Sequence, residues 1–150
     1  MAIWQFDISF VDRGGSSPQR TDDGHEVPSL SVERTKQANA WLNEIFGSPW
    51  EMLDGWYIFG EEVGNRVDLL MIADGSSELS ARIDLRGDPS AFIARICELG
   101  NVVNCSLFSA ELWSPIEPVP NDVTQAIGAS RAAAYVQDPL GMLREIASGA

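Results

Sequence analysis

Basic residues are scarce in this sequence: 10 Lys and Arg stand against 22 Asp and Glu, and the net charge at pH 7 is −12. Nucleic acids and anionic lipid surfaces attract positively charged proteins, so the shortage of basic residues argues against both as partners. The same imbalance favours a basic protein as the partner, because complementary charge speeds the encounter of two proteins.

Histidine and cysteine are also rare, with one His and two Cys in the chain, so we expect no zinc site, no other metal and no cofactor. Cys97 and Cys105 both lie in apolar segments, which favours buried, reduced thiols over a disulfide. No apolar run approaches the ~18 residues of a membrane span. The amino terminus lacks the basic and apolar segments of a secretory signal, and we expect a cytoplasmic location.

The 150 residues are enough for one domain with a substantial core, and the first elements are a strand, a loop and a helix. Apolar and polar side chains alternate over residues 3–11, which is typical of a half-buried strand. Residues 12–31 lose this periodicity and are rich in Gly, Ser, Pro and Asp, which predicts a long exposed loop. Ser31 is placed to cap a helix that runs to about Phe46.

The middle of the chain predicts further strands and a second helix. Residues 56–59 are extended, and residues 67–73 are nearly all apolar, which favours a strand covered on both faces. A turn at Asp74-Gly75 leads into the alternating segment 79–86, which completes a hairpin. Asp88-Pro89 is a typical helix start, and this second helix ends near Gly100.

The carboxyl-terminal third predicts one more strand at 102–108 and an irregular or edge segment at 114–120, which holds three prolines. An alanine-rich helix follows from Asn121 or Asp122 to about Val136. Asp138-Pro139 begins a short last helix whose apolar residues are Leu140, Leu143 and Ile146.

This order of elements predicts an α+β fold with an antiparallel or mixed sheet of about five strands. We expect a split βαβ, ferredoxin-like order, with the helices mainly on one face and two extra helices at the carboxyl end.

No catalytic arrangement is evident. His25 lies in the predicted loop beside Asp23 and Glu26, and no nucleophile can be assigned to it, so a solvated loop histidine is the better interpretation. Acidic pairs such as Glu61-Glu62 lack the spacing of a known acid–base or calcium site. The sequence therefore favours a non-enzymatic protein.

Arginines gather on one predicted strand. Arg82, Asp84 and Arg86 share a strand face, and Arg66 and Asp68 lie across the hairpin on the same face. Guanidinium groups bind planar anions through paired hydrogen bonds, so these residues are candidates for an anion site. A ladder of ion pairs on a solvated sheet face is the favoured alternative.

The five tryptophans divide into two groups. Trp4 and Trp41 lie on predicted buried stripes, which core packing explains, whereas the other three lie near element ends among acidic residues. Aromatic residues ringed by acids suit the interface with a basic protein, although covering the sheet edges is an equal alternative. The candidate partner-binding residues are Asp22, Asp23, Glu26, Trp50, Glu51, Asp54, Trp56, Glu61, Glu62 and Trp113.

Two segments carry a family resemblance. The stretch Ser130-Arg131-Ala132-Ala133-Ala134-Tyr135-Val136-Gln137-Asp138-Pro139, followed by Met142-Leu143, is one, and Ala81-Arg82-Ile83-Asp84-Leu85-Arg86 before an Asp-capped helix is the other. Together they resemble the acidic immunity proteins of bacterial toxin systems over the last half of the chain. The resemblance implies a non-enzymatic protein that neutralises a basic toxin domain by occlusion, and it assigns no binding residues.

Two other functions stay open. A small-molecule or anion-binding domain, or a small enzyme, would use Arg66, Arg82, Asp84 and Arg86, and a deep pocket around them would favour it. A structural or regulatory homo-oligomer, in the simplest case a homodimer, would use the apolar carboxyl-terminal helices.

Overall fold

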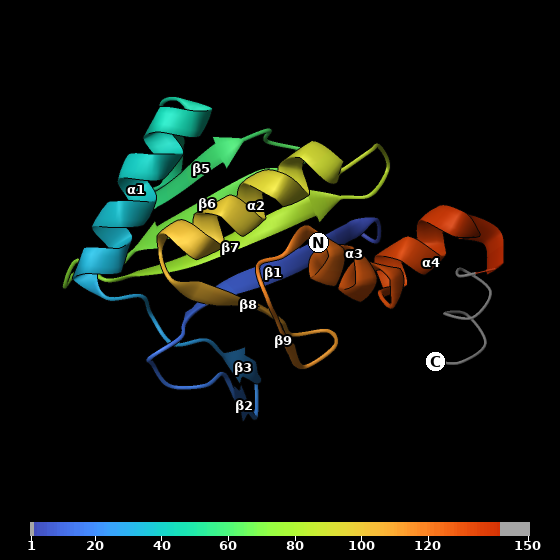
Figure 1. Ribbon diagram of the computed structural model, residues 1–150, viewed down its shortest axis with the longest axis horizontal. Helices are drawn as coiled ribbons and strands as arrows, with labels where there is room; N and C mark the ends of the chain where they lie inside the picture. Colours follow the sequence, from blue (N-terminus) through green and yellow to red (C-terminus); the bar gives the residue numbers. More distant parts are fainter. Residues whose placement is uncertain (1, 142–150) are drawn as a thin grey trace.

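The chain forms a seven-stranded antiparallel sheet with helices packed on one side, in a computed structural model that describes residues 2–141 (Figure 1). The strands of this sheet stand in the order β4-β5-β6-β7-β1-β8-β9. Their bounds are β1 Gln5–Asp12, β4 Trp50–Leu53, β5 Trp56–Gly60, β6 Arg66–Met71, β7 Ser77–Asp84, β8 Cys105–Ser109 and β9 Ser114–Ile116. A separate hairpin is formed by β2, Gln19–Thr21, and β3, Gly24–Glu26.

Helices α1, Val32–Phe46, and α2, Ser90–Val102, cover one face of the sheet, as Figure 1 shows. The side chain of Ser31 caps α1 by accepting a hydrogen bond from the backbone N–H of Arg34 at 3.1 Å. Pro89 occupies the N-cap of α2 without a side-chain cap bond, but the carboxylate of Asp88, one residue earlier, accepts from the N–H of Ser90 at 3.0 Å. Polar side chains thus define both helix starts that the sequence predicts.

The core lies between these two helices and the sheet. Alternate residues of β1 and β7 point into it and are almost fully buried, and α1 and α2 supply the opposite wall. Its main members are Phe6, Ile8, Phe10, Leu42, Val67, Leu69, Ala81, Ile83, Phe92, Ile96 and Leu99. The period-two and helical patterns of the sequence account for this packing.

The predicted α+β class and antiparallel sheet are confirmed, but the five-stranded ferredoxin-like order is not. The sheet has seven strands, because the segments 50–53 and 114–116 pair at its two edges. Residues 12–31 are mostly exposed but not structureless, since they contain the β2–β3 hairpin, and the expectation was wrong for Leu30, which is fully buried in the core.

Two finer predictions were wrong. Strand β6 is not covered on both faces, because Val67 and Leu69 are buried whereas Leu70 is exposed. The alanine-rich segment is two helices, α3 Pro120–Gly128 and α4 Arg131–Gln137. The hydroxyl of Ser130 divides them, because it caps α4 by accepting from the N–H of Ala133 at 3.2 Å.

Residues 139–141 are helical, as the last predicted helix requires. Leu143 and Ile146 of that helix, and Met142 of the family resemblance, lie outside the described residues. Within residues 2–141, no helix has both the length and the apolar character to cross a bilayer.

Both edges of the sheet carry features that oppose further strand pairing. The edge strand β9 has three residues with Pro115 at its centre, and proline has no backbone N–H to donate. At the other edge, β4 is short, bulged between Glu51 and Leu53, and followed by Asp54. Shortness, bulges, prolines and edge charges are devices that block edge-to-edge association.

Cys97 and Cys105 are buried free thiols, and burial raises the pKa of each to about 11. We expect neither thiol to react with Ellman's reagent at pH 8 in the folded protein, and both to react at once in urea. In the unfolded chain the thiols titrate near 9.0, so the free energy of unfolding will be level below pH 9 and fall as the pH rises toward 11. Urea titrations over this pH range check this expectation. A C97A/C105A variant is the control, and an equal fall in that variant would contradict a thiol origin.

Candidate binding face

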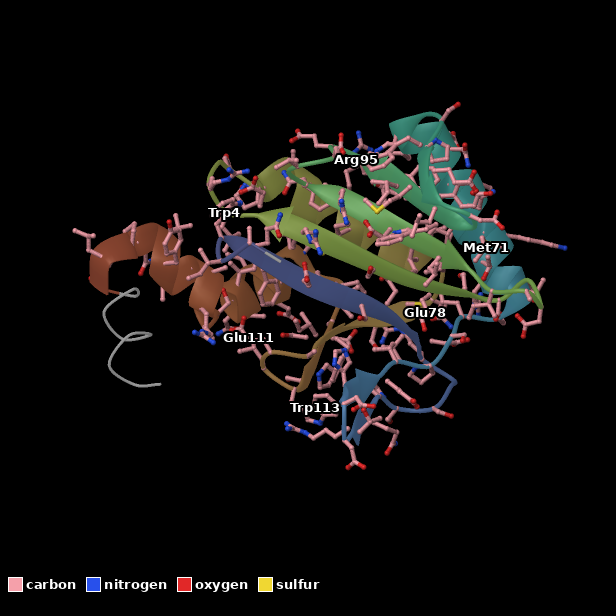
Figure 2. The ribbon with its side chains drawn as sticks, turned by 180° about the vertical axis from the view of Figure 1, so that it is seen from behind. Trp4, Met71, Glu78, Arg95, Glu111 and Trp113 are labelled. Atoms are coloured by element: carbon pink, nitrogen blue, oxygen red, sulfur yellow. The ribbon has the colours of Figure 1, made fainter. Side chains whose placement is uncertain are left out.

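The face of the sheet opposite α1 and α2, here called the open face, is not covered by a helix of residues 2–141 (Figure 2). Register places Asp7 opposite Arg82 on it, and Ser9 opposite Ser80. The neighbouring strand β6 adds Asp68, which is paired with Ser80. The open face is therefore polar at its centre, in contrast to the apolar face beneath the helices.

A buried ion pair lies on the β6 side of the open face. The guanidinium Nε of Arg66 lies 3.0 Å from Oδ1 of Asp68, and the two side chains are only 7% and 16% exposed. The other carboxylate oxygen of Asp68 accepts from the indole N–H of Trp56 at 3.0 Å. Arg66 also donates to the carbonyl of Glu62 at 3.2 Å, so the pair holds β5, β6 and their connecting turn together.

The remaining arginines of the predicted anion site are also paired with carboxylates. Arg82 donates to Asp7 of β1 at 3.2 Å, and Arg86 lies 2.7 Å from Asp84. The hydrogen bond from Arg86 lowers the pKa of Asp84 below its ordinary value. The guanidinium of Arg86 also lies 4.4 Å from the centre of the Trp4 ring. Each arginine of this set thus faces a carboxylate, but the pairs do not form the predicted cross-strand ladder, because only Arg82 and Asp7 pair between strands.

The β2–β3 hairpin stands at the other side of the open face and is held there by Trp113. The Trp113 ring lies 5.0 Å from that of Phe108 and 6.2 Å from that of His25, both nearly perpendicular to it. The guanidinium of Arg20 lies 4.3 Å from its centre, a cation–π contact. Trp113 adopts a φ of 49°, a left-handed conformation that is rare for a bulky residue.

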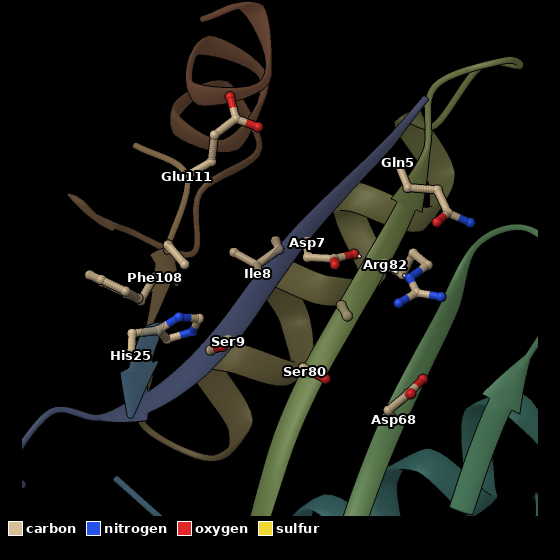
Figure 3. Close-up of a pocket in the computed structure, with 12 residues that line it drawn as sticks. Gln5, Asp7, Ile8, Ser9, His25, Asp68, Ser80, Arg82, Phe108 and Glu111 are labelled. Carbon is tan, nitrogen blue, oxygen red and sulfur yellow. Dashed lines mark hydrogen bonds and ion pairs between the residues drawn. The ribbon is translucent and has the colours of Figure 1, made fainter. Parts of the chain in front are cut away.

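Two hollows that share Ser9, His25 and Ser80, together called the groove, lie between this hairpin and strands β1 and β7, and Figure 3 shows the first of them. Their volumes are about 290 and 460 Å³. Five carboxylates border the groove, those of Asp7, Glu26, Asp68, Glu78 and Glu111. The arginine that lines it is Arg82.

His25 is exposed and faces the groove, but the geometry gives it no partner for catalysis. Its ring makes no hydrogen bond to Ser9 or Ser80, which line the same hollow (Figure 3). Within residues 2–141, no three His, Cys, Asp or Glu side chains converge as metal ligands.

The structure divides the predicted partner-binding residues among three places. Asp22, Asp23 and Glu26 lie on the β2–β3 hairpin beside Trp113. A second group surrounds β4, at the far edge of the sheet: Trp50, Glu51, Asp54 and Trp56. Glu61 and Glu62 lie in the turn between β5 and β6. All seven acids are exposed, whereas the three tryptophans are only partly so.

Acidic residues and tryptophans of the β4 group have structural roles as well. Glu51 accepts from the backbone N–H of Gly55 at 3.1 Å and so closes the β4–β5 turn. Its negative charge also raises the pKa of the Tyr57 phenol. The indole N–H of Trp56 donates to the carboxylate of Asp68. Outside this group, Trp4 and Trp41, which the sequence assigned to the core, are partly exposed.

Sequence reasoning missed the groove itself. Asp7 and Ser9 belong to the polar side of the first predicted strand and Ser80 to that of the predicted strand 79–86, so alternation does place them on one face, whereas Glu78 lies just outside the predicted strand. The missing information was that β1 pairs with β7, and that the 12–31 segment folds back beside both strands.

The comparisons with known proteins return no similarity: no family model, no curated protein and no solved structure matches the chain.

Proposed function

We propose that this chain is a non-enzymatic binding protein that seats a basic protein against its open face and blocks it by occlusion. The family resemblance adds a biological setting, a bacterial immunity protein that neutralises a toxin domain in the cytoplasm. The observation that carries the proposal is the open face itself, which no helix of residues 2–141 covers and which carboxylates border.

The distribution of charge supports a basic partner. The arginines of the open face are engaged by neighbouring carboxylates, whereas the acids of the hairpin and of the β4–β5 and β5–β6 turns project into solvent. The outward potential of this side of the molecule is therefore negative. Such a surface steers an oppositely charged protein during diffusion and gives a rate that falls with added salt.

The alternatives receive less support from the geometry. An anion-binding site needs a free guanidinium fork, and Arg66, Arg82 and Arg86 each face a carboxylate within 3.2 Å. Association of two copies through sheet edges is opposed by Pro115 at one edge and by the bulge and acids at the other, whereas a homo-oligomer through the carboxyl-terminal helices stays a prediction.

A pull-down from the lysate of the source organism at low salt, eluted by a salt gradient, tests the proposed function. We expect one basic protein in stoichiometric amount, and the purified pair then gives two decisive measurements. The partner's activity must be lost when the complex forms, because occlusion covers its working surface. A complex in which the partner retains full activity contradicts the proposal.

The steering role is tested on the same pair by stopped-flow association. Replacing Asp22 and Asp23 by Asn and Glu26 by Gln should slow association severalfold at low salt and flatten its salt dependence. The matched set E61Q/E62Q reports whether the turn between β5 and β6 contributes as well. Association that stays as fast as in the parent chain in both sets removes the steering role from the proposal.

A further inference from the structure

Within the open face, the groove is a hollow into which a side chain of the partner can insert. Its floor is made by the small residues Ser9 and Ser80, which stand opposite each other on β1 and β7. One wall is the hairpin that carries His25, and the other is the edge formed by Asp7 and Arg82. Figure 3 shows the His25 ring near Ser9 on one side of β1, and the Asp7 carboxylate directed toward Arg82 on the other.

The carboxylates around the groove differ in how far they are already engaged. Glu111 accepts from the N–H of Arg131 at 2.9 Å and so caps α4, and Asp68 belongs to the buried pair with Arg66. Asp7 is 38% exposed and holds Arg82 through one hydrogen bond of 3.2 Å. Glu26 and Glu78 are exposed and make no ion pair within residues 2–141.

Cationic side chains match this arrangement, and arginine matches it better than lysine. Its planar group donates five hydrogen bonds in fixed directions, which suits carboxylates on two sides and serine hydroxyls below. A guanidinium also stacks on aromatic rings, and the His25 ring lines the groove. The contact of Arg20 with Trp113 shows the same chemistry within the chain, a few residues away.

We infer that the groove binds an arginine side chain of the basic partner, between Glu26 and Glu78 of the wall and Asp7 of the opposite edge. This inference rests on the proposed function and adds to it the site and the recognised group. The bound guanidinium lies over Ser9 and Ser80, and Asp7 shares its charge between this guanidinium and that of Arg82.

The probe is a six-residue arginine peptide with blocked ends, added to the ¹⁵N-labelled chain at low salt and followed by amide chemical shifts. We expect the largest shifts at Ser9, His25 and Ser80, and weaker binding of the corresponding lysine peptide by about threefold or more. Replacing Glu26 and Glu78 by Gln should weaken arginine-peptide binding about tenfold, as for the loss of two charge-assisted contacts.

The control variant is E33Q/E44Q, which removes the same charge from exposed positions of α1, on the covered side of the sheet, and it should change the affinity less than about twofold. Equal losses of arginine-peptide affinity in the two variants, or amide chemical-shift changes spread over the acidic turns, would overturn the inference. Chemical-shift changes concentrated at β4 and β5 would also overturn the inference. They would still be consistent with a basic partner that binds at another part of the surface. If the pull-down recovers no basic protein while the groove still binds the arginine peptide, the proposed function is rejected instead.

Discussion

Replacement of Asp68 by alanine will lower the free energy of unfolding by about 3–5 kcal/mol, the usual result of removing one member of a buried ion pair. The substitution leaves the guanidinium of Arg66, 7% exposed, without the carboxylate that neutralises it. It also removes the acceptor of the Trp56 indole N–H. Urea unfolding at pH 7, followed by tryptophan fluorescence and circular dichroism, measures the loss.

The control is the double variant R66M/D68L, which removes both charges and puts apolar side chains in their place. We expect it to recover most of the lost stability, since apolar replacement of a buried pair is often neutral or stabilising. The single change R66M should fall between the two, because Asp68 is 16% exposed and keeps its bond from Trp56. If D68A unfolds at the parent's urea concentration, the pair does not join β5 to β6 as described.

Replacement of Trp113 by alanine will release the β2–β3 hairpin from the open face. The hairpin strands have three residues each and are fully exposed, and isolated two-stranded hairpins are at best marginally stable in water. The ring of Trp113 supplies the contacts to Arg20 and His25 that hold it. We expect the amides of residues 19–26 to exchange with deuterium at least about tenfold faster, an opening that is easier by about 1.4 kcal/mol.

Strands β1 and β7 provide the internal reference for this measurement, since their amides should keep their protection. The conservative variant W113F retains a ring against Phe108 and Arg20 and should restore part of the protection. Faster exchange throughout the sheet would show general destabilisation rather than release of the hairpin. Unchanged exchange at residues 19–26 would show that Trp113 does not hold it.

The sequence allowed the helices and the central strands to be predicted because their signals are local. Ser31 before an apolar stripe and Asp88 before Ser90 each create a hydrogen-bonded start for a helix. The turn at Asp74-Gly75 does the same for the β6–β7 hairpin, with Gly75 at a φ of 90°. These interactions join residues a few positions apart, so a single sequence reveals them.

The rest of the fold depends on pairings between distant residues. The segment Trp50–Leu53 has no alternation and follows Pro49, and it becomes a strand only because β5 is there to pair with it. The break at Ser130 was hidden because alanine-rich sequence on both sides favours helix. Tertiary context decided both cases, as it often does for short elements.

Of the candidate binding residues predicted from the sequence, only Glu26, Asp68 and Arg82 line the groove. Asp22, Asp23 and Glu26 do lie beside the open face, yet Trp113, expected as a partner contact, is already in contact with Phe108, Arg20 and His25. The alternation of polar and apolar residues predicts which side chains of one strand share a face. No local pattern predicts which strands are neighbours in the sheet.

The features that oppose strand pairing at both edges of the sheet limit how the proposed partner can be recognised. A partner strand added to an open edge is bound mainly through backbone hydrogen bonds, which are the same for every sequence. Pro115 at one edge and the bulge after Glu51 at the other oppose that route, so the proposed recognition of a basic partner relies on side chains of the open face. Such a surface can change its choice of partner through a few substitutions on β1, β7 and the hairpin, while the core residues on the opposite side of the same strands keep the fold intact.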